Sequence, residues 1–291
     1  MDDIYYLSGS SDLPLKKKLI IKAALTGNIS KKSDNPNVPI SPEEIIEDVR
    51  KCYAAGATFF HLHARGEDGK PSCKKEIFEE IMSGIRKHCN DAVVCLTAGG
   101  RVFKTLEERS TVLELEEGLK PEFASLATGS FNFPKETSMN SPELIMKLAT
   151  KMTSRNISPE LEIFDTGMLN YAVYLARKNI IKPPLHFNLI FGLLGTSPAR
   201  MIDICHMVQS LPDGSVWSAA GGGRFQLPVN LSAMVMGGHV RVGLEDNLYY
   251  DYEKTIPATN EMLVKRLVKL ADEMGRPVAK PSEAREILGL K

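Results

Sequence analysis

The amino-acid sequence predicts an α/β protein built as a single (β/α)8 TIM barrel. Short apolar runs alternate with segments of helical periodicity along the chain, and about eight such strand-helix units can be counted. The length of 291 residues suits this architecture, which typically needs about 250 residues. We therefore expect one barrel domain over residues 1–291, with an N-terminal extension and a C-terminal helix.

The first strand-helix unit carries the clearest local signals. An apolar run at residues 19–25 predicts a strand, and the turn-forming residues Thr26, Gly27 and Asn28 follow it. Ser41 then provides a helix cap, Pro42 occupies the first helical position, and Glu44 completes a capping box. The first helix is expected to begin there and to end near residue 55.

The same alternation continues to the end of the chain. Strands are expected at residues 59–63, 93–97, 123–126, 161–164, 185–191, 216–220 and 239–243. Helices are expected at residues 75–87, 106–115, 142–155, 169–178, 198–210 and 227–236, and a long terminal helix at 260–274. This count favours a closed barrel over an open doubly wound sheet.

Composition excludes several classes of partner. Lys and Arg number 36 and Asp and Glu number 36, so no basic surface for nucleic acid is expected. The five cysteines are scattered and form no Cys-x-x-Cys pair, which indicates a reducing compartment. No apolar run approaches the roughly 20 residues that span a bilayer, and residues 1–11 lack a signal-peptide pattern. We expect a cytoplasmic protein with no membrane partner.

His61 and His63 form the most informative short motif. Residues two apart in a strand point the same way, so both imidazoles converge at the carboxyl end of the expected second strand. Two imidazoles are typical ligands of a divalent metal, most often zinc, and Glu245 after the eighth strand offers a third ligand. The alternative is a pair of hydrogen-bonded histidines at a strand end, for which the motif alone gives about even odds.

Asp246 and Arg241 extend this predicted site. Asp246 is a candidate general base, and Arg241 on the same segment is a cation that can orient a carboxylate. An acidic pair that begins a helix, with a surface arginine nearby, is the structural alternative.

Polar residues also end three other expected strands. Thr97 and Ser125 are candidates for binding a substrate carboxylate or carbonyl. Glu160 and Glu162 are both candidates to face a ligand, and Glu162 is a candidate member of a proton-transfer network. Local capping of turns or helices explains the two hydroxyl residues equally well.

The sequence after the seventh strand indicates a nucleotide-bearing cosubstrate. Gly222 and Gly223 would offer backbone amides to phosphates, and Arg224 would add a positive charge, in the loop region where barrels commonly bind phosphate. A tight turn is the competing interpretation.

Taken together, these motifs resemble the β-keto acid cleavage enzyme family, whose type member acts on 3-keto-5-aminohexanoate. The similarity covers nearly the whole chain and is carried by residues 23–27, 36–44, 55–57, 61–65, 237–247 and 284–288.

The resemblance implies a zinc-dependent transferase that condenses a β-keto acid with acetyl-CoA to give acetoacetate and an acyl-CoA. It implies zinc ligation by His61, His63 and Glu245. It also implies that Asp246, paired with Arg241, removes the substrate proton, with support from Glu162 and Thr97. A homo-oligomer, with a tetramer favoured, is expected on the same grounds.

One position departs from the family's type member. That enzyme has a glutamate that binds the substrate amine where this chain has Ile29. Because an apolar side chain does not neutralise an ammonium group, we expect a different acyl tail. If Arg101 faces the pocket, a dicarboxylic keto acid becomes the candidate; otherwise Arg101 is an exposed loop residue.

Two other readings of the motifs compete with this one. Metal-dependent hydrolases on TIM barrels also use His-x-His, but they need further histidines at later strand ends. His186 begins its strand and His239 precedes the centre of the eighth strand, which places both poorly for that service. A non-catalytic binding barrel is the third reading, because barrels host many functions.

Overall fold

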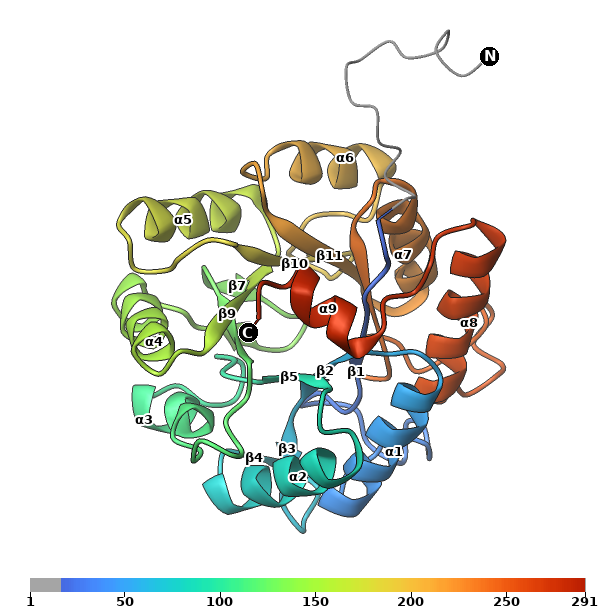
Figure 1. Cartoon of the computed structure of the whole chain (residues 1–291), viewed down its shortest axis with the longest axis horizontal. Helices are drawn as coiled ribbons and strands as arrows, with labels where there is room; N and C mark the ends of the chain where they lie inside the picture. The colour runs from blue at the N-terminus through green and yellow to red at the C-terminus, as the bar shows by residue number, and fades with distance from the viewer. Residues whose placement is uncertain (1–16, 291) are drawn as a thin grey trace, which may run out of the picture.

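The computed structural model describes residues 17–290 and shows, within them, a closed barrel of eight parallel strands (Figure 1). In chain order these strands are β1 (Ile21–Ala24), β2 (Phe59–Leu62), β5 (Val93–Leu96), β6 (Phe123–Ala127), β9 (Ser158–Ile163), β10 (His186–Phe191), β11 (Val216–Gly221) and β12 (His239–Val242). The barrel closes because β1 pairs with both β2 and β12. The predicted fold class is confirmed. The predicted N-terminal extension, for which the sequence set no bounds, falls largely in residues 1–16, outside the described residues.

Helices surround the barrel on its outer face (Figure 1). They are α1 (Pro42–Ala54), α2 (Lys75–His88), α3 (Leu106–Ser110), α4 (Pro142–Ser154), α5 (Thr166–Arg177), α6 (Met201–Gln209), α7 (Gln226–Val235) and α8 (Asn260–Glu273). The predicted capping box of α1 is present, because Ser41 accepts from the Glu44 amide and the Glu44 side chain accepts from the Ser41 amide. In residues 17–290, no helix has the length and apolar character that crossing a membrane requires.

The predicted boundaries agree with the structure within three residues, except at the carboxyl end of the helix expected at 106–115. The helix expected at 106–115 ends at Ser110 and continues as the 3-10 turn η2 (Thr111–Leu113), where two β-branched residues disfavour further α-helix. Strand β9 begins three residues earlier than expected and includes Pro159. Proline is tolerated near the first residue of a strand, so it did not mark a break here.

Three small features at the two ends of the barrel were not predicted. The hairpin β3 (Ala64–Arg65) and β4 (Pro71–Ser72) follows β2, and the hairpin β7 (Phe131–Asn132) and β8 (Thr137–Ser138) follows β6. The short helix α9 (Pro281–Ile287) lies across the barrel axis (Figure 1).

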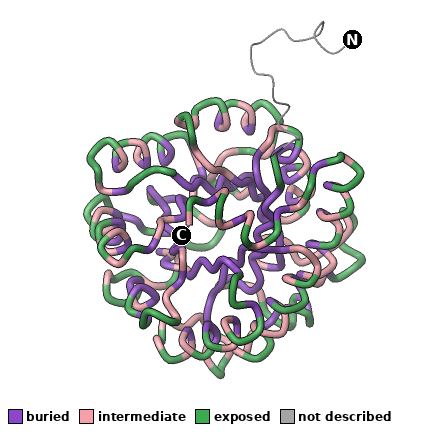
Figure 2. Tube along the Cα trace, viewed as in Figure 1, coloured by how far each residue is buried: buried purple, intermediate pink, exposed green. Residues whose placement is uncertain are grey.

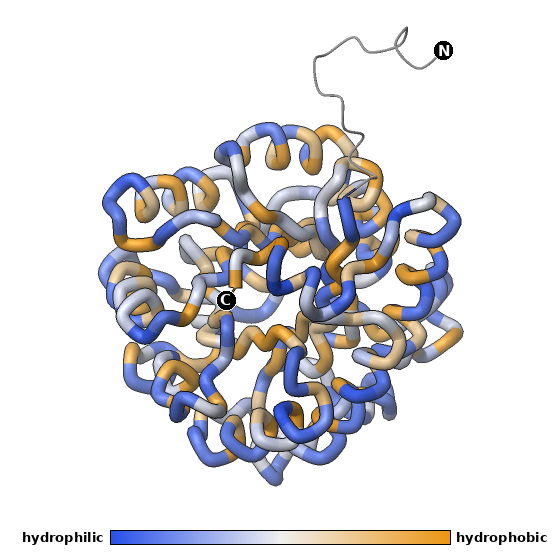
Figure 3. The backbone as a smooth tube through the Cα atoms, viewed as in Figure 1, coloured by the Kyte–Doolittle hydropathy of each residue, from blue (hydrophilic) through white to orange (hydrophobic). Residues whose placement is uncertain are grey.

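Two apolar layers stabilise this architecture. The strands are buried and lie at the centre of the molecule (Figure 2). The larger layer lies between the strands and the outer helices, whose apolar stripes face inward while their polar faces meet solvent (Figure 3). The smaller layer joins inward-facing Phe59 and Phe123 to Ala284 and Leu288 at α9. This second layer fills the amino end of the barrel, so a ligand is expected to enter from the carboxyl end.

Candidate active site

A cavity of about 230 Å³ opens at the carboxyl end of the barrel. This is the end at which (β/α)8 enzymes place their active sites. The structure brings seven of the residues predicted from sequence into its wall: His61, His63, Thr97, Glu162, Arg241, Glu245 and Asp246.

The two histidines and Glu245 converge on one point in this cavity. The Nε2 atoms of His61 and His63 lie 3.1 Å apart. Glu245 Oε1 lies 3.3 Å from His63 Nε2, and Glu245 Oε2 lies 3.6 Å from His61 Nε2. Two imidazole nitrogens and a carboxylate therefore face one another at hydrogen-bond or ion-pair distances.

The Nδ1 atoms of both rings face acceptors, which indicates the tautomers. His63 Nδ1 lies 3.0 Å from Asn28 Oδ1, and His61 Nδ1 lies 3.6 Å from Glu160 Oε2. With protons on Nδ1, both Nε2 lone pairs point at each other and at a carboxylate, so none of the three groups donates to another. A bound cation satisfies this arrangement, and zinc suits a donor set of two imidazoles and a carboxylate.

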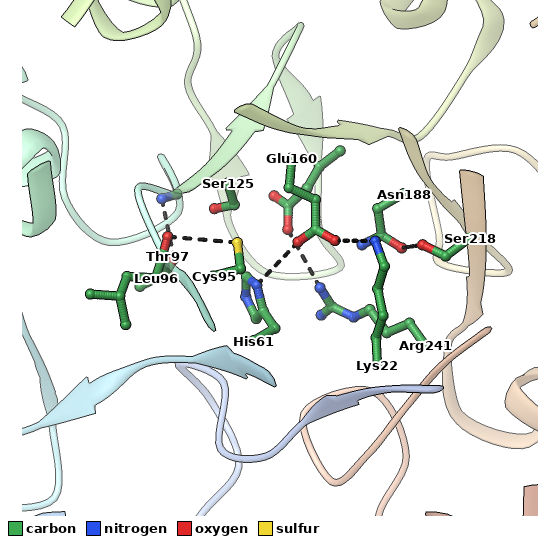
Figure 4. A network of polar contacts seen from close by, with 12 residues as sticks. Lys22, His61, Cys95, Leu96, Thr97, Ser125, Glu160, Asn188, Ser218 and Arg241 are labelled. Atoms are coloured by element: carbon green, nitrogen blue, oxygen red, sulfur yellow. Dashed lines mark hydrogen bonds and ion pairs between the residues drawn. The ribbon is translucent and has the colours of Figure 1, made fainter. Parts of the chain in front are cut away.

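A second group of metal-binding atoms shares His61 but is less suitable. His61, Cys95 and Glu160 also lie close together, fully buried inside the barrel. The Lys22 ammonium lies 2.7 Å from Glu160 Oε1 and contributes the positive charge that this carboxylate needs (Figure 4). A metal ion there would face Lys22 at close range, so Glu160 is better suited to orienting His61.

Close backbone approach after β12 places Glu245 and Asp246 in the cavity. Gly243 has a φ of 152°, and a Cβ there would lie 2.0 Å from the Ala24 carbonyl oxygen. Gly27 has a φ of 63°, and a Cβ there would meet Glu245 Cγ at 2.6 Å. Both positions require glycine because a side chain would force the acidic pair away from the histidines.

Arg241 organises the acidic side of the cavity. Its Nε and Nη2 atoms bind both oxygens of Asp246, at 2.9 and 3.1 Å. The same guanidinium lies 2.9 Å from Glu245 and 3.5 Å from Glu162. Arg241 is 2 % exposed, so its charge acts on these carboxylates with little screening by water.

Burial and the charges nearby together give Glu162, Asp246 and Glu245 different pKa values. Burial raises the pKa of Glu162 to about 6, although His61 and Arg241 oppose the shift. Burial also raises the pKa of Asp246 against the pull of Arg241. For Glu245, burial is outweighed by Arg241 and the two histidines, which hold its pKa well below the usual range. Glu245 is therefore suited to binding a cation, while Glu162 and Asp246 are suited to exchanging protons.

Four predicted residues lie outside this cavity. The Ser125 hydroxyl does not line the cavity and accepts a hydrogen bond from the Ala98 amide at 3.1 Å. The amides of Gly222 and Gly223 were expected to bind phosphate, but they donate to the Phe191 and Asp246 carbonyls and are not free for it.

Arg224 is the fourth of these residues, and it is exposed on the 3-10 turn η3 (Gly223–Phe225). Its guanidinium lies 5.6 Å from the ring centre of Tyr252 and 5.5 Å from that of Phe225. It therefore remains a candidate for an external phosphate, but without help from the glycine amides.

Sequence reasoning missed Asn28 and Lys22, which complete the site. Asn28 follows a turn glycine and orients His63. Its place in the turn that begins at Thr26 is the only feature that marks it in the sequence. Lys22 is a charged residue within an apolar strand run, which is a signal of a buried ion pair that could have been used. Its partner is Glu160, which the sequence analysis had named as a polar residue near a strand end.

The structure places His186 and His239 at the opposite end of the barrel. The His239 Nδ1 atom accepts a hydrogen bond from the Ile20 amide at 3.0 Å, and the His186 ring packs against Phe123. Neither ring lines the cavity that holds His61. The extra histidine ligands that a hydrolase of the His-x-His type needs are therefore absent from the described cavity wall.

Fold and site together define a class: a (β/α)8 barrel whose carboxyl-end cavity holds a candidate metal site beside a buried arginine-carboxylate pair. The chain belongs to the beta-keto acid cleavage enzyme family, whose model matches residues 18–290. The family predicted from the sequence is thereby confirmed, and with it the prediction that the chain is an enzyme.

Similar proteins extend over nearly the same residues. A 3-keto-5-aminohexanoate cleavage enzyme from Acetoanaerobium sticklandii is 43% identical over 94% of this chain and 99% of its own length. A 3-oxoadipate:acetyl-CoA acetyltransferase from Cupriavidus necator is 38% identical over 93% of this chain and 94% of its own length. Among solved structures, the apo structure of ObcA has a TM-score of 0.79 at 19% identity, covering 88% of this chain and 66% of that one, which supports the fold.

Proposed function

We propose that this protein is a zinc-dependent enzyme that converts a β-keto acid and acetyl-CoA into acetoacetate and the CoA thioester of the remaining acyl group. The observation that carries the proposal is the meeting, in one cavity, of a metal-suited triad and an Asp246–Arg241 pair. The relatives named above support the acetyl-CoA part, since one of them is named an acetyl-CoA acetyltransferase.

His61, His63 and Glu245 would hold the metal. When bound, zinc supplies Lewis-acid stabilisation of negative charge on a substrate oxygen.

The remaining residues move and stabilise the proton. Asp246 is the base that takes a proton from C2 of the keto acid, and Arg241 holds its carboxylate in place through two hydrogen bonds. Glu162 adjoins Arg241 and has a pKa raised to about 6 by burial, so it can exchange that proton near neutral pH. The Thr97 hydroxyl lies in the same wall and is available to the substrate carboxylate.

The bond changes balance without any other reactant. The C2 carbanion attacks the acetyl carbonyl carbon and the CoA thiolate leaves. The thiolate then adds to C3 of the keto acid, and the bond between C2 and C3 breaks. C2 keeps its carboxylate and the new acetyl group as acetoacetate, and the proton returns from Asp246.

The direct test is the release of acetoacetate from purified protein with zinc, acetyl-CoA and a panel of β-keto acids. Asp246→Asn should retain one metal per chain and lose activity by roughly 10²- to 10⁴-fold, because it removes the base and leaves the metal ligands in place. The exposed Asp213→Asn is a matched control that should keep full activity. Near-normal turnover by Asp246→Asn would remove Asp246 from this role, and hydrolysis without acetyl-CoA would replace the proposal with the hydrolase.

Three predictions accompany this proposal. The chain is expected to form one domain over residues 1–291, a homo-oligomer with a tetramer favoured, and to reside in the cytoplasm. Light scattering of the purified protein checks the oligomer.

A further inference from the structure

Arg101 and Phe133 form the outer wall of the cavity, away from the candidate metal site. Arg101 follows β5, and Phe133 lies in the hairpin between β7 and β8. Ile29, after β1, completes this rim and is 44% exposed. The rim contacts the part of a substrate that extends from the reacting carbons, because His61, Asp246 and Arg241 lie at the buried end.

The Arg101 guanidinium is held in place from two directions. Its Cζ lies 3.9 Å from the centre of the Phe133 ring, an arrangement typical of cation-π contact. Its Nε lies 3.3 Å from Glu136 Oε2. These contacts leave the two Nη atoms without a hydrogen-bond partner within residues 17–290. A fixed planar fork of this kind suits a carboxylate.

The charges along the cavity wall separate its two ends. Glu162, Glu245 and Asp246 all contact Arg241 at the buried end. The rest of the described wall contains no acidic side chain. A cationic tail would therefore meet Arg101 and the apolar Ile29, whereas an anionic tail would meet an oriented positive charge.

We propose that the substrate is a 3-oxo dicarboxylic acid, whose tail carboxylate is bound by Arg101 at the rim. This inference rests on the proposed function. The named relatives include enzymes for an amino-substituted keto acid and for 3-oxoadipate, at similar identities to this chain. Ile29 and Arg101 therefore decide between the two kinds of tail.

The test compares acids that differ only at the tail, with acetyl-CoA at saturation. The acids are 3-oxoadipate, the neutral 3-oxohexanoate and the cationic 3-keto-5-aminohexanoate. We expect kcat/KM for 3-oxoadipate to exceed that for 3-oxohexanoate by roughly 10- to 100-fold, as for a hydrogen bond between charged groups. The amino-substituted 3-keto-5-aminohexanoate should have the lowest kcat/KM of the three.

Variants assign this preference to Arg101. Arg101→Gln should bring the ratio for the two acids close to one, and Arg101→Lys should restore it in part because lysine keeps the charge without the fork. Glu136→Gln should raise the ratio, because it removes a competing carboxylate. Arg50→Gln, an exposed change on α1, should leave the ratio as it is.

The outcomes separate this inference from the proposed function. Turnover with a preference for the neutral or the amino acid, or a preference that survives Arg101→Gln, overturns the dicarboxylic substrate and leaves the reaction intact. If no acid reacts, calorimetry with adipate and hexanoate still decides. Adipate that binds no better than hexanoate, or equally well to Arg101→Gln, overturns the inference.

Discussion

Two pairs of histidines occupy opposite ends of this barrel, and their surroundings give them different chemistry. His61 and His63 lie at the carboxyl end with three carboxylates nearby. At the amino end the His186 ring packs against Phe123, and His239 lines a pocket with the basic residues Lys17 and Lys18. Burial, with the Lys22 charge, lowers the pKa of His186 to about 3. Burial and the same charge hold the pKa of His239 well below its usual range.

This difference teaches that charge, more than burial, selects the histidines suited to a metal. All four rings are buried, and burial alone lowers the pKa of each. The carboxylates near His61 nevertheless raise its pKa above the ordinary value, whereas the pKa values of His63, His186 and His239 are lowered. At the carboxyl end Glu245 adds negative charge between the two Nε2 atoms, and at the amino end Lys22 adds positive charge. A cation is therefore attracted to one end and repelled from the other.

The largest expected effect comes from removing one histidine from each end of the barrel, which tests which pair binds the metal. His61→Gln should abolish stoichiometric zinc binding, since it removes one of three ligands, while His186→Gln should bind one zinc per chain. Metal analysis after dialysis against zinc measures both. Equal metal content in the two variants would show that the carboxyl-end pair is not the ligand set.

The Lys22–Glu160 ion pair acts on both ends of the barrel. Glu160 contacts His61 at the carboxyl end, and the Lys22 charge lowers the pKa of His186 at the amino end. Glu160→Gln should weaken zinc affinity by roughly 10- to 100-fold, as expected for a group that orients a ligand. It should also destabilise the fold by about 3–5 kcal/mol, because the Lys22 charge loses its buried partner. Competitive titration with a chelator and urea unfolding measure the two effects.

The double variant Lys22→Met with Glu160→Gln is the control for this prediction. It removes both buried charges, so it should recover most of the stability but not the zinc affinity. Recovery of both quantities would mean that Glu160 acts on stability alone.

The smallest expected effect concerns acid stability. The folded-state pKa of His186 is about 3 and its unfolded value is about 6.5, so only the unfolded chain binds this proton between those pH values. The stability linked to His186 is complete above pH 6.5 and falls by about 1.4 kcal/mol per pH unit below it.

His186→Gln removes that proton, and the loss of stability between pH 7 and pH 5 should be smaller by about 2 kcal/mol. Urea unfolding at the two pH values, beside the wild-type protein, measures the difference. An unchanged loss would show that Glu160, the ion-pair partner of Lys22, offsets the effect of burial and of the Lys22 charge on His186.

Much of the site could be predicted because its residues stand at strand ends. His61, His63 and Glu245 follow short apolar runs, and the parallel arrangement of strands carries such residues to one end. The glycine amides after β11 could not be judged from sequence, because their carbonyl partners lie on β10 and beyond β12. The role of Ser125 depended in the same way on the segment after the neighbouring strand β5, which supplies the Ala98 amide.

The sequence by itself determined the eight strand-helix units and the residues that end each strand, because apolar periodicity and capping are local properties of the chain. The tertiary structure decided which of those residues meet. Lys22 and Glu160 are 138 positions apart, and Arg101 meets Phe133 through a hairpin that the sequence did not predict. Such pairs depend on barrel closure and on the register between strands, which side-chain packing across the whole molecule sets.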